Sequence, residues 1–406
     1  MLLAPPNSYR LAAYLGAARS LGIDLVVASA GEHSLIAEVA DGLHLDPGDP
    51  QDALARIVAF AASRPLQGIL ASDDATVELA ALAAQALGLP ANPPEATRLA
   101  RRKDLARAHL QAAGVPVPAH RLVDLGRELA PQLAGFPLPA VAKPVSLSAS
   151  RGVIRADTLD ELLAACETIT GIVADLEHPD ESGYLLLEAY IDGVEVAADG
   201  LLGPDGLQPL ALFDKPEPLV GPYFEESYYV TPSRLDAGVQ QAVWRTIAAA
   251  CDSYGLRHGP VHAELRITAA GPVILEVAAR TIGGECARMF DRCLTVGLES
   301  LALSAAVGRL PMVTPPERAT GVLMIPIPRA GVLRRVDGIE AAAAVPGVSD
   351  VRITAAPGHE LQTLPDAAGY LGFIFADAET PAEVEGALRH AHEVLDIKID
   401  PLWRIA

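Results

Sequence analysis

Residues 261–280 read VHAELRITAAGPVILEVAAR, and this stretch decides the interpretation of the chain. Apolar residues recur on both sides of the turn signal at 269–272, so we expect the two halves to pair as a β-hairpin. Glu264 and Glu276 are nearly equidistant from the turn and are predicted to lie on one face. Two such carboxylates repel unless a cation lies between them, and Mg²⁺ held by carboxylates and nucleotide phosphates meets that requirement. Arg280 adds a permanent, forked positive charge, although a salt-bridged strand surface remains the alternative.

Upstream of the hairpin, two lysines and a loop of small residues are candidates for phosphate binding. Lys143 ends an apolar strand pattern, so its ammonium is expected to emerge at a strand end. Lys103 lies in a helical pattern that follows a proline-rich linker, where an ordinary surface lysine is the alternative. Hydroxyl groups and backbone N–H groups of a short loop can bind phosphate oxygens. The loop comprises residues 146–153 and is called the phosphate loop below. Its residues that we assign to this role are Ser148, Ser150 and Gly152.

Two further glutamates frame a short apolar segment between the phosphate loop and the hairpin. Glu188 precedes this segment, which includes Tyr190 and Ile191, and Glu195 follows it. The segment is suited to adenosine, because its backbone and apolar side chains can receive adenine. The second carboxylate can accept both ribose hydroxyls, since an ionised carboxylate offers two acceptor oxygens. A surface hairpin with two solvated glutamates is the alternative.

Composition restricts the class of protein. The chain has 406 residues, of which 50% are hydrophobic and 20% charged, so it can bury a large core. Its formal net charge of −20 argues against binding to nucleic acid or an anionic membrane. Four cysteines without a CxxC pair predict no disulfide framework. The N-terminus has no signal-peptide pattern and no stretch is apolar enough to span a bilayer, so we expect a cytoplasmic protein.

The order of strand and helix patterns predicts an α/β and α+β multidomain chain. Strand–helix alternation over 1–92 indicates a doubly wound parallel sheet domain, although it lacks GxGxxG. Mixed patterns over 93–315 indicate a second domain with a small subdomain at about 115–192. A C-terminal α+β domain is expected over 316–406, in which Thr380 opens a capping box with proline at the first helical position.

Taken in order, these residues resemble the ATP-grasp superfamily, and the resemblance covers essentially the whole chain. It implies the ATP-grasp fold, ATP, and Mg²⁺ or Mn²⁺ held by Glu264 and Glu276. It assigns these residues to ATP: Lys103, Lys143, Ser148, Ser150, Gly152, Glu188, Tyr190, Ile191 and Glu195. Ala278 stands where many relatives have a metal-binding asparagine, so metal binding would rest more on the two glutamates.

Within the superfamily, the chain looks most like the L-amino acid ligases, which synthesise dipeptides. The resemblance is carried by 212–226, by the arginine and glycines at 280–284, and by the region from Thr320 onward. It implies ATP-dependent joining of two L-amino acids through an acyl phosphate, with Arg280 as the catalytic residue. It further implies amino-acid substrates and a homodimer. The residues assigned to substrate are Lys215, Glu226, His262, Gly283 and Gly284.

The sequence is compatible with two other functions. The same fold could use a non-amino-acid amine or carboxylate in purine or secondary metabolism, but the chain has no biotin-type Met-Lys-Met segment. A non-catalytic nucleotide-binding protein should have lost a lysine, a metal carboxylate or Arg280, and all of these are present.

Overall fold

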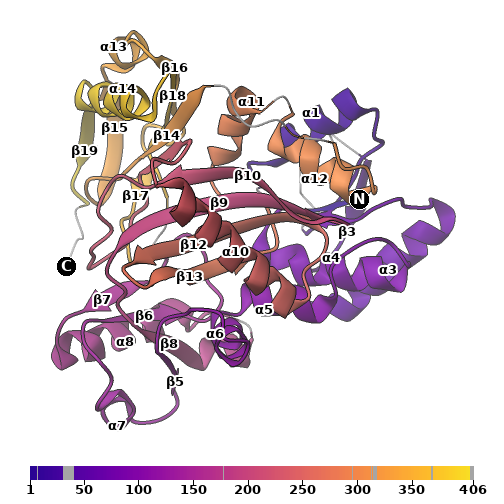
Figure 1. Ribbon diagram of the computed structural model, residues 1–406, viewed down its shortest axis with the longest axis horizontal. Helices are drawn as coiled ribbons and strands as arrows, with labels where there is room; N and C mark the ends of the chain where they lie inside the picture. The colour runs from indigo at the N-terminus through magenta and orange to yellow at the C-terminus, as the bar shows by residue number, and fades with distance from the viewer. Residues whose placement is uncertain are drawn as a thin grey trace.

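The computed structural model describes residues 1–6, 8–30, 41–176, 178–294, 296–311, 313, 318–366 and 369–402. Figure 1 shows four parts: a central sheet with its helices and, around it, the N-terminal unit, a lobe below the sheet and the C-terminal unit. The predicted α/β and α+β multidomain arrangement is confirmed, and its parts meet around one cavity.

The N-terminal unit is a parallel sheet of order β3-β2-β1-β4. Its elements are β1 (Leu2–Leu3), α1 (Leu11–Leu21), β2 (Val26–Ser29), β3 (Asp41–His44), α3 (Pro50–Ser63), β4 (Leu70–Ala71) and α4 (Asp74–Ala86). Leu2 packs with Tyr14 of α1 on one face, whereas Leu3 packs with Ile57 of α3 on the other. Alternate residues of each strand thus bury both faces under helices, as a doubly wound sheet requires.

The helical pattern predicted around Lys103 forms two helices, α5 (Pro94–Arg101) and α6 (Lys103–Ala112). Arg102 interrupts them with an extended backbone, and its guanidinium pairs with Asp104 and Asp180. This break makes Lys103 the first residue of α6. The backbone N–H of Lys103 donates to the carbonyl of Val145, which ties the helix to the phosphate loop.

The lobe below the central sheet has an antiparallel sheet of order β5-β8-β6-β7 covered by helices (Figure 1). Its elements are β5 (His120–Asp124), α7 (Leu129–Leu133), β6 (Ala140–Pro144), β7 (Ile154–Ala156), α8 (Leu159–Val173), α9 (Pro179–Ser182) and β8 (Tyr184–Ala189). Ala142 and Leu187 pack against Cys166 and Ile169 of α8 in its core. Because successive side chains of a strand point to opposite faces, the next residues, Lys143 of β6 and Glu188 of β8, face the cavity.

The central sheet has eight strands in the order β13-β12-β9-β10-β11-β14-β18-β16, and its paired neighbours are antiparallel. The strands are β9 (Val194–Gly203), β10 (Gly206–Asp214), β11 (Tyr228–Thr231), β12 (Gly259–Thr268), β13 (Gly271–Ala278), β14 (Ala319–Ile325), β16 (Val348–Ile353) and β18 (Gly372–Ala378). Helix α10 (Ala237–Tyr254) packs on one face through Val243 and Ile247. A 3₁₀ turn (Cys286–Met289), α11 (Phe290–Cys293) and α12 (Leu298–Ala306) pack on the other.

The C-terminal unit adds a small sheet of order β17-β15-β19 and two helices. Its elements are β15 (Gly331–Asp337), α13 (Ile339–Ala343), β17 (Glu360–Leu361), α14 (Pro381–Glu393) and β19 (Asp396–Asp400). The capping box predicted at Thr380 is present, with Glu383 as its partner. Strands β14 and β18 extend the central sheet, so this unit shares its hydrogen bonds with the preceding one. The predicted boundary at 315/316 lies outside the described residues, and the domain limits stay predictions.

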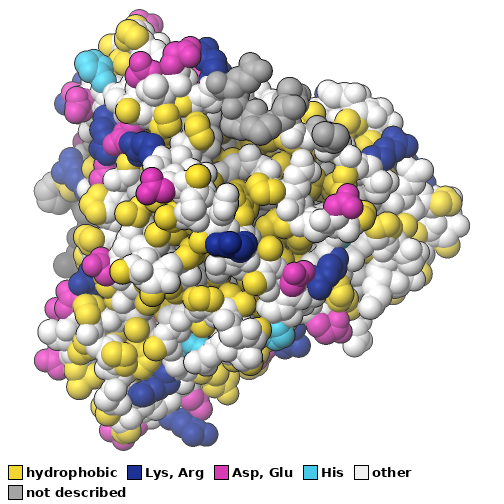
Figure 2. Space-filling view, in the orientation of Figure 1, with side chains coloured by type: hydrophobic (Ala, Val, Ile, Leu, Met, Phe, Trp, Pro, Cys, Tyr) yellow, Lys and Arg dark blue, Asp and Glu magenta, His cyan; other side chains and the backbone are white. Residues whose placement is uncertain are grey.

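On the face in Figure 2, the described Lys and Arg side chains are scattered among acidic and apolar ones. Among the described residues, no helix is both long and apolar enough to cross a membrane.

Candidate active site

One large cavity, of about 680 Å³, lies where the four parts of the molecule meet. Most residues selected from the sequence line it, namely Lys103, Lys143, Ser148, Ser150, Glu188, Tyr190, Ile191, Glu195, Glu226, His262, Glu264, Glu276, Arg280, Gly283 and Gly284. Gly152 and Lys215 lie outside its lining. Residues more than 180 positions apart in the sequence therefore converge on a single space.

Glu264 of β12 and Glu276 of β13 are directly paired across the hairpin. A β-bulge at Leu275 produces this pairing, because the next pair on the turn side is Leu265 with Ile274. Without the extra residue, Leu275 would stand opposite Glu264, and the alternation of side chains would turn Glu276 to the other face. The backbone irregularity thus brings both carboxylates to the cavity.

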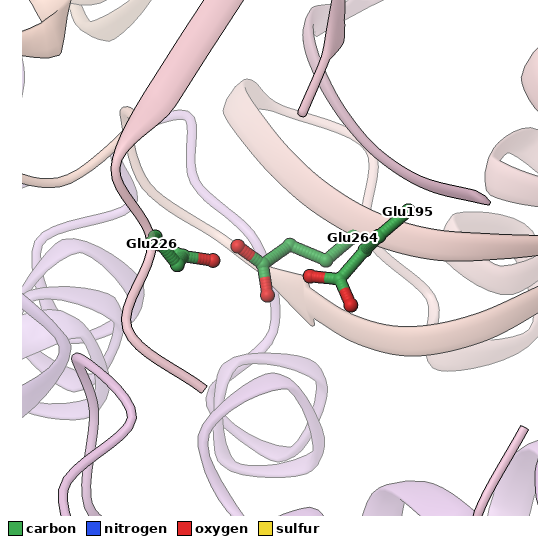
Figure 3. A group of neighbouring side chains, drawn as sticks. All are labelled: Glu195, Glu226 and Glu264. Carbon is green, nitrogen blue, oxygen red and sulfur yellow. The ribbon is translucent and has the colours of Figure 1, made fainter. Parts of the chain in front are cut away.

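The cation beside Glu264 in this structure is Lys215, which follows β10. Its Nζ lies 2.9 Å from Glu195 Oε1 and 3.0 Å from Glu264 Oε1, and it also pairs with Glu226. Figure 3 shows the carboxyl groups of these three glutamates converging from separate segments. Lys215 is buried and does not line the cavity, so it neutralises the acidic cluster from beneath the cavity surface.

The pKa values of the groups in this cluster shift in opposite directions. Burial and repulsion from Glu264 raise the pKa of Glu226 to about 7. Burial opposes ionisation of Glu264, but Lys215 and His262 outweigh it and hold its pKa well below the ordinary value. Although burial alone would lower it, the pKa of His262 rises to about 9 because Asp199 lies 3.2 Å away and Glu264 adjoins it. At neutral pH the cluster therefore keeps an ionised Glu264 beside two cations.

The two predicted phosphate lysines lie on neighbouring elements. Lys103 Nζ is 3.3 Å from Glu276 Oε2 and donates to the carbonyl of Leu147 in the phosphate loop. Lys143 Nζ is 2.6 Å from Glu188 Oε2, and the other oxygen of Glu188 accepts from Arg107 Nε at 2.6 Å. Burial lowers the pKa of Lys143 despite this partner. Glu188 thus orients two cations.

Tyr190 and Glu195 are connected through Arg266. The Arg266 guanidinium lies 4.9 Å from the centre of the Tyr190 ring, and its Nε is 2.9 Å from Glu195 Oε2. It also donates to the carbonyl of Ile191 at 2.7 Å. Phe224 stacks with Tyr190, with ring centres 6.5 Å apart, and its own ring centre lies 5.7 Å from the same guanidinium. The predicted adenosine segment is therefore held by stacked aromatic rings and by the contacts of Arg266.

The phosphate loop has an unusual backbone and is held by the C-terminal unit. Ala149 and Ser150 both adopt positive φ, at 54° and 56°. Gly152 has φ of 71°, and a Cβ there would approach Pro144 Cγ to 2.9 Å. The N–H of Gly152 donates to the carbonyl of Pro365 at 3.2 Å. Glycine at 152 thus allows both the turn and the close approach.

Arg280 lies at the end of the hairpin beside the two predicted glycines. Its Nη1 donates to the carbonyl of Thr281 at 2.9 Å, and its Nε pairs with Asp74 of the N-terminal unit at 2.7 Å. Gly284 adopts φ of 61° at the apolar end of the cavity. A side chain there would touch Cys286 and Phe373 at 3.6 Å.

Several residues of the site were missed in the sequence. Arg107 lies one helical turn after Lys103 on α6, a spacing that places both on one face. Arg266 follows His262 and Glu264 at alternate positions of β12, which also predicts a shared face. Asp74 comes just after a parallel strand, where ligand sites of α/β sheets lie. Asp199 had no such signal, because its partner His262 lies 63 positions away in the sequence. Tyr229, whose hydroxyl donates to Glu226 three residues earlier, was missed as well.

The donor set is compatible with a divalent ion. Glu195, Glu226 and Glu264 offer oxygen atoms that lie within 4.8 Å of one another, and Glu276 adds a carboxylate from the neighbouring strand. Carboxylate oxygens are the ligands that Mg²⁺ and Mn²⁺ prefer. Because lysines now balance these charges, an ion would share Glu264 with Lys215 and Glu276 with Lys103.

Comparison with protein families identifies three segments. Residues 15–91 match the ATP-grasp N-terminal domain, residues 136–289 match the ATP-grasp domain, and residues 323–400 match the L-amino acid ligase C-terminal domain 2. The three segments follow one another along the chain in the order of the observed units.

Similar individual proteins were also found. An uncharacterized protein of Sinorhizobium fredii is 28% identical over 318 residues, which are 77% of this chain and 64% of the relative. Carnosine synthase 1 of Gallus gallus is 30% identical over 290 residues, which are 66% of this chain and 31% of that protein. The chain thus spans less than two thirds of the length of these relatives.

A solved structure resembles the whole molecule. The L-amino acid ligase of Bacillus licheniformis superposes with a TM-score of 0.87 at 24% identity, covering 98% of both chains. This likeness establishes a common fold, and the matching families add the sequence relationship. The chain belongs to the ATP-grasp superfamily and carries the C-terminal domain found in L-amino acid ligases.

Proposed function

We propose that the protein is an ATP-dependent carboxylate–amine ligase that joins two amino acids and releases ADP and phosphate. The observation that carries this proposal is the single cavity in which Lys103, Lys143, Glu264, Glu276 and Arg280 converge. It is supported by the L-amino acid ligase domain at the C-terminus and by the similarity to carnosine synthase.

The proposed chemistry begins with activation of a carboxylate, because an oxide ion is a very poor leaving group. A carboxylate oxygen attacks the γ-phosphorus of ATP, which forms an acyl phosphate and releases ADP. The amine of the second amino acid then attacks the carbonyl carbon, and phosphate leaves with the original carboxylate oxygen. Catalysis of both steps depends mainly on positioning and on stabilisation of negative charge.

Each group in the cavity has a role in this scheme. Lys103 and Lys143 bind phosphate oxygens, and the loop at 146–153 covers them to exclude water. Tyr190 and Ile191 face adenine, while Glu195 receives the ribose. Arg280 binds the reacting carboxylate and then the oxyanion of the tetrahedral intermediate. These assignments are supported by the positions of the residues on the cavity wall, whereas Gly152 would act through the shape of the loop.

Glu264 and Glu276 would hold Mg²⁺ or Mn²⁺, which would neutralise the charge of the phosphates when bound. Glu226, beside Lys215 and the hydroxyl of Tyr229, is placed to receive the ammonium of an amino acid. His262 shares the face of Glu264 and lies near the same substrate region. Gly283 and Gly284 leave room beside Arg280 for the acyl substrate.

The test is phosphate release from ATP and Mg²⁺ with amino acids added singly and in pairs, with products identified by mass spectrometry. We expect release to require two amino acids and to match dipeptide formation. Release with one carboxylate and a non-amino-acid amine would instead favour another ligase of this superfamily. Nucleotide binding without release under any pairing would favour a regulatory protein.

A further inference from the structure

The N-terminal unit forms part of the cavity wall through two loops. Arg10 precedes α1 and Asp74 begins α4, and each follows one of the neighbouring parallel strands β1 and β4. Both residues line the cavity. These loops therefore bring side chains from the beginning of the chain to the hairpin that carries Arg280.

Asp74 makes a direct ion pair with Arg280. Its Oδ2 lies 2.7 Å from Arg280 Nε, and the exposed fractions of the two side chains are 18% and 9%. A pair this well shielded from water is stronger than a surface pair and fixes the direction of the guanidinium plane. The orientation of Arg280 is thus set by a residue about 200 positions earlier in the chain.

Arg10 holds the backbone that follows Arg280. Its Nη2 donates to the carbonyl of Ile282 at 2.7 Å, and its Nη1 donates to the hydroxyl of Thr281 at 2.5 Å. Arg280 itself donates to the carbonyl of Thr281. Side chain and backbone of the arginine segment are therefore both fixed by contacts from the N-terminal unit or from within the segment.

Asp74 is also the anion between several cations. Burial opposes its ionisation, but the charges of Arg280, Lys103 and Arg10 outweigh burial and hold the pKa of Asp74 below its ordinary value. Without this carboxylate, the repulsion between the charges of Arg280 and Arg10 would be less well compensated, whereas Lys103 would keep its pairing with Glu276. Asp74 thus allows cations for the phosphates and for the acyl group to lie close together.

The pairing leaves part of the Arg280 fork available. A guanidinium has five N–H donors on three nitrogens. Asp74 occupies Nε and Thr281 occupies one hydrogen of Nη1. Within the described part of the chain, Nη2 has no hydrogen-bond partner. One edge of the guanidinium is therefore anchored, and the remainder can meet a ligand oxygen in the cavity.

We propose that Asp74 is a positioning residue for the reaction, which holds Arg280 in the direction needed to bind the acyl group, with Arg10 holding the adjoining backbone. The inference rests on the proposed ligase function and adds to it that the N-terminal unit completes the reaction site. Misplacement of a reacting group by about 1 Å can reduce the rate about 10²-fold. The contribution of Asp74 should therefore appear in turnover more than in nucleotide binding.

The test compares Asp74→Asn and Asp74→Glu with a matched control, Asp377→Asn. Asp377 is a similarly shielded aspartate, with 20% exposure, that pairs with Arg292 outside the cavity. We expect Asp74→Asn to reduce kcat about 10²-fold while the KM for ATP changes little. Asp74→Glu should recover part of kcat, because the charge returns. Asp377→Asn should keep kcat near that of the wild type even if its melting temperature falls.

Equal kcat in Asp74→Asn and Asp377→Asn would overturn the inference, as would a loss that Asp74→Glu does not relieve. If Asp74→Asn fails to fold, Arg10→Lys supplies the same comparison, since it loses the fork that holds 281–282. Unchanged kcat in Arg10→Lys would then count against the proposal. The wild-type protein tests the ligase function itself, and the ratio of variant to wild type tests the positioning, so the two failures are distinguishable.

Discussion

Glu264 and Glu276 stand opposite each other on β12 and β13, and both carboxylates line the cavity. Their nearest cations are Lys215 and Lys103, at 3.0 and 3.3 Å. Glu264 and Glu276 would therefore have to share a divalent ion with these ammonium groups or exchange the ammonium groups for it.

Glu264→Gln and Glu276→Gln should each weaken metal-dependent turnover. Removing one carboxylate lowers the charge that attracts the ion, so we expect the Mg²⁺ concentration for half-maximal activity to rise at least about tenfold. Titration of activity with Mg²⁺ and with Mn²⁺ measures the change. Glu217→Gln, at a half-exposed position paired with Arg389, is the control. A metal requirement equal to that of the control would remove these glutamates from the proposed metal site.

Arg280→Ala should retain nucleotide binding and lose most ligation. The loss of one donor to a developing oxyanion typically costs about 10² to 10³ in rate, and Arg280 is assigned that role here. Isothermal titration with ADP measures binding, and phosphate release measures turnover. Arg280→Lys keeps the charge but loses the forked donor geometry, so its turnover should lie between those of the wild type and Arg280→Ala. Wild-type turnover in Arg280→Ala would refute the catalytic role.

Gly152→Ala should uncouple phosphate release from product formation. Both Gly152 and Gly114 have positive φ, of 71° and 74°, so alanine at either site should cost about 1–2 kcal/mol. Only at 152 does the added Cβ meet a neighbour, Pro144 at 2.9 Å, so only there should the loop shift and admit water. The ratio of phosphate to dipeptide should rise in Gly152→Ala and stay near one in Gly114→Ala. Equal ratios in both variants would argue against a sealing role of the loop.

Glu188 should contribute stability that is lost in acid. Burial opposes its ionisation, but Arg107 and Lys143 hold its pKa below the ordinary value of 4.5. Its contribution is therefore complete well above pH 4.5 and disappears as pH falls through the lower folded pKa. Thermal unfolding of wild type and Glu188→Gln should differ by about 3–5 kcal/mol near pH 7. That difference should shrink below pH 4.5, and a gap independent of pH would contradict the ion-pair account.

Local signals in the sequence predicted much of the fold. The capping box at Thr380 and the alternation around the 269–272 turn depend on neighbouring residues, so both were readable. The helix break at Arg102 was not, because it is accompanied by pairing with the distant Asp180. Long-range contacts of this kind override local helix preference.

Most residues of the candidate site could be predicted from the sequence, but the contacts among them could not. The sequence predicted Glu264 and Glu276 on one face from their similar distances to the turn. That reasoning did not reveal the bulge at Leu275, which is what pairs the two residues. Lys215 was expected at the substrate, whereas the structure surrounds it with three glutamates. The Asp74–Arg280 pair joins residues about 200 positions apart, and no periodicity could reveal it.

Activation of the amino-acid carboxylate by phosphate transfer can be followed by tracing its oxygen atoms. The enzyme is incubated with ATP, Mg²⁺ and a pair of amino acids whose acyl partner carries ¹⁸O in its carboxylate. Mass spectrometry of the released phosphate should find one ¹⁸O atom per molecule, in step with dipeptide formed. Unlabelled phosphate, or label in AMP, would contradict the account.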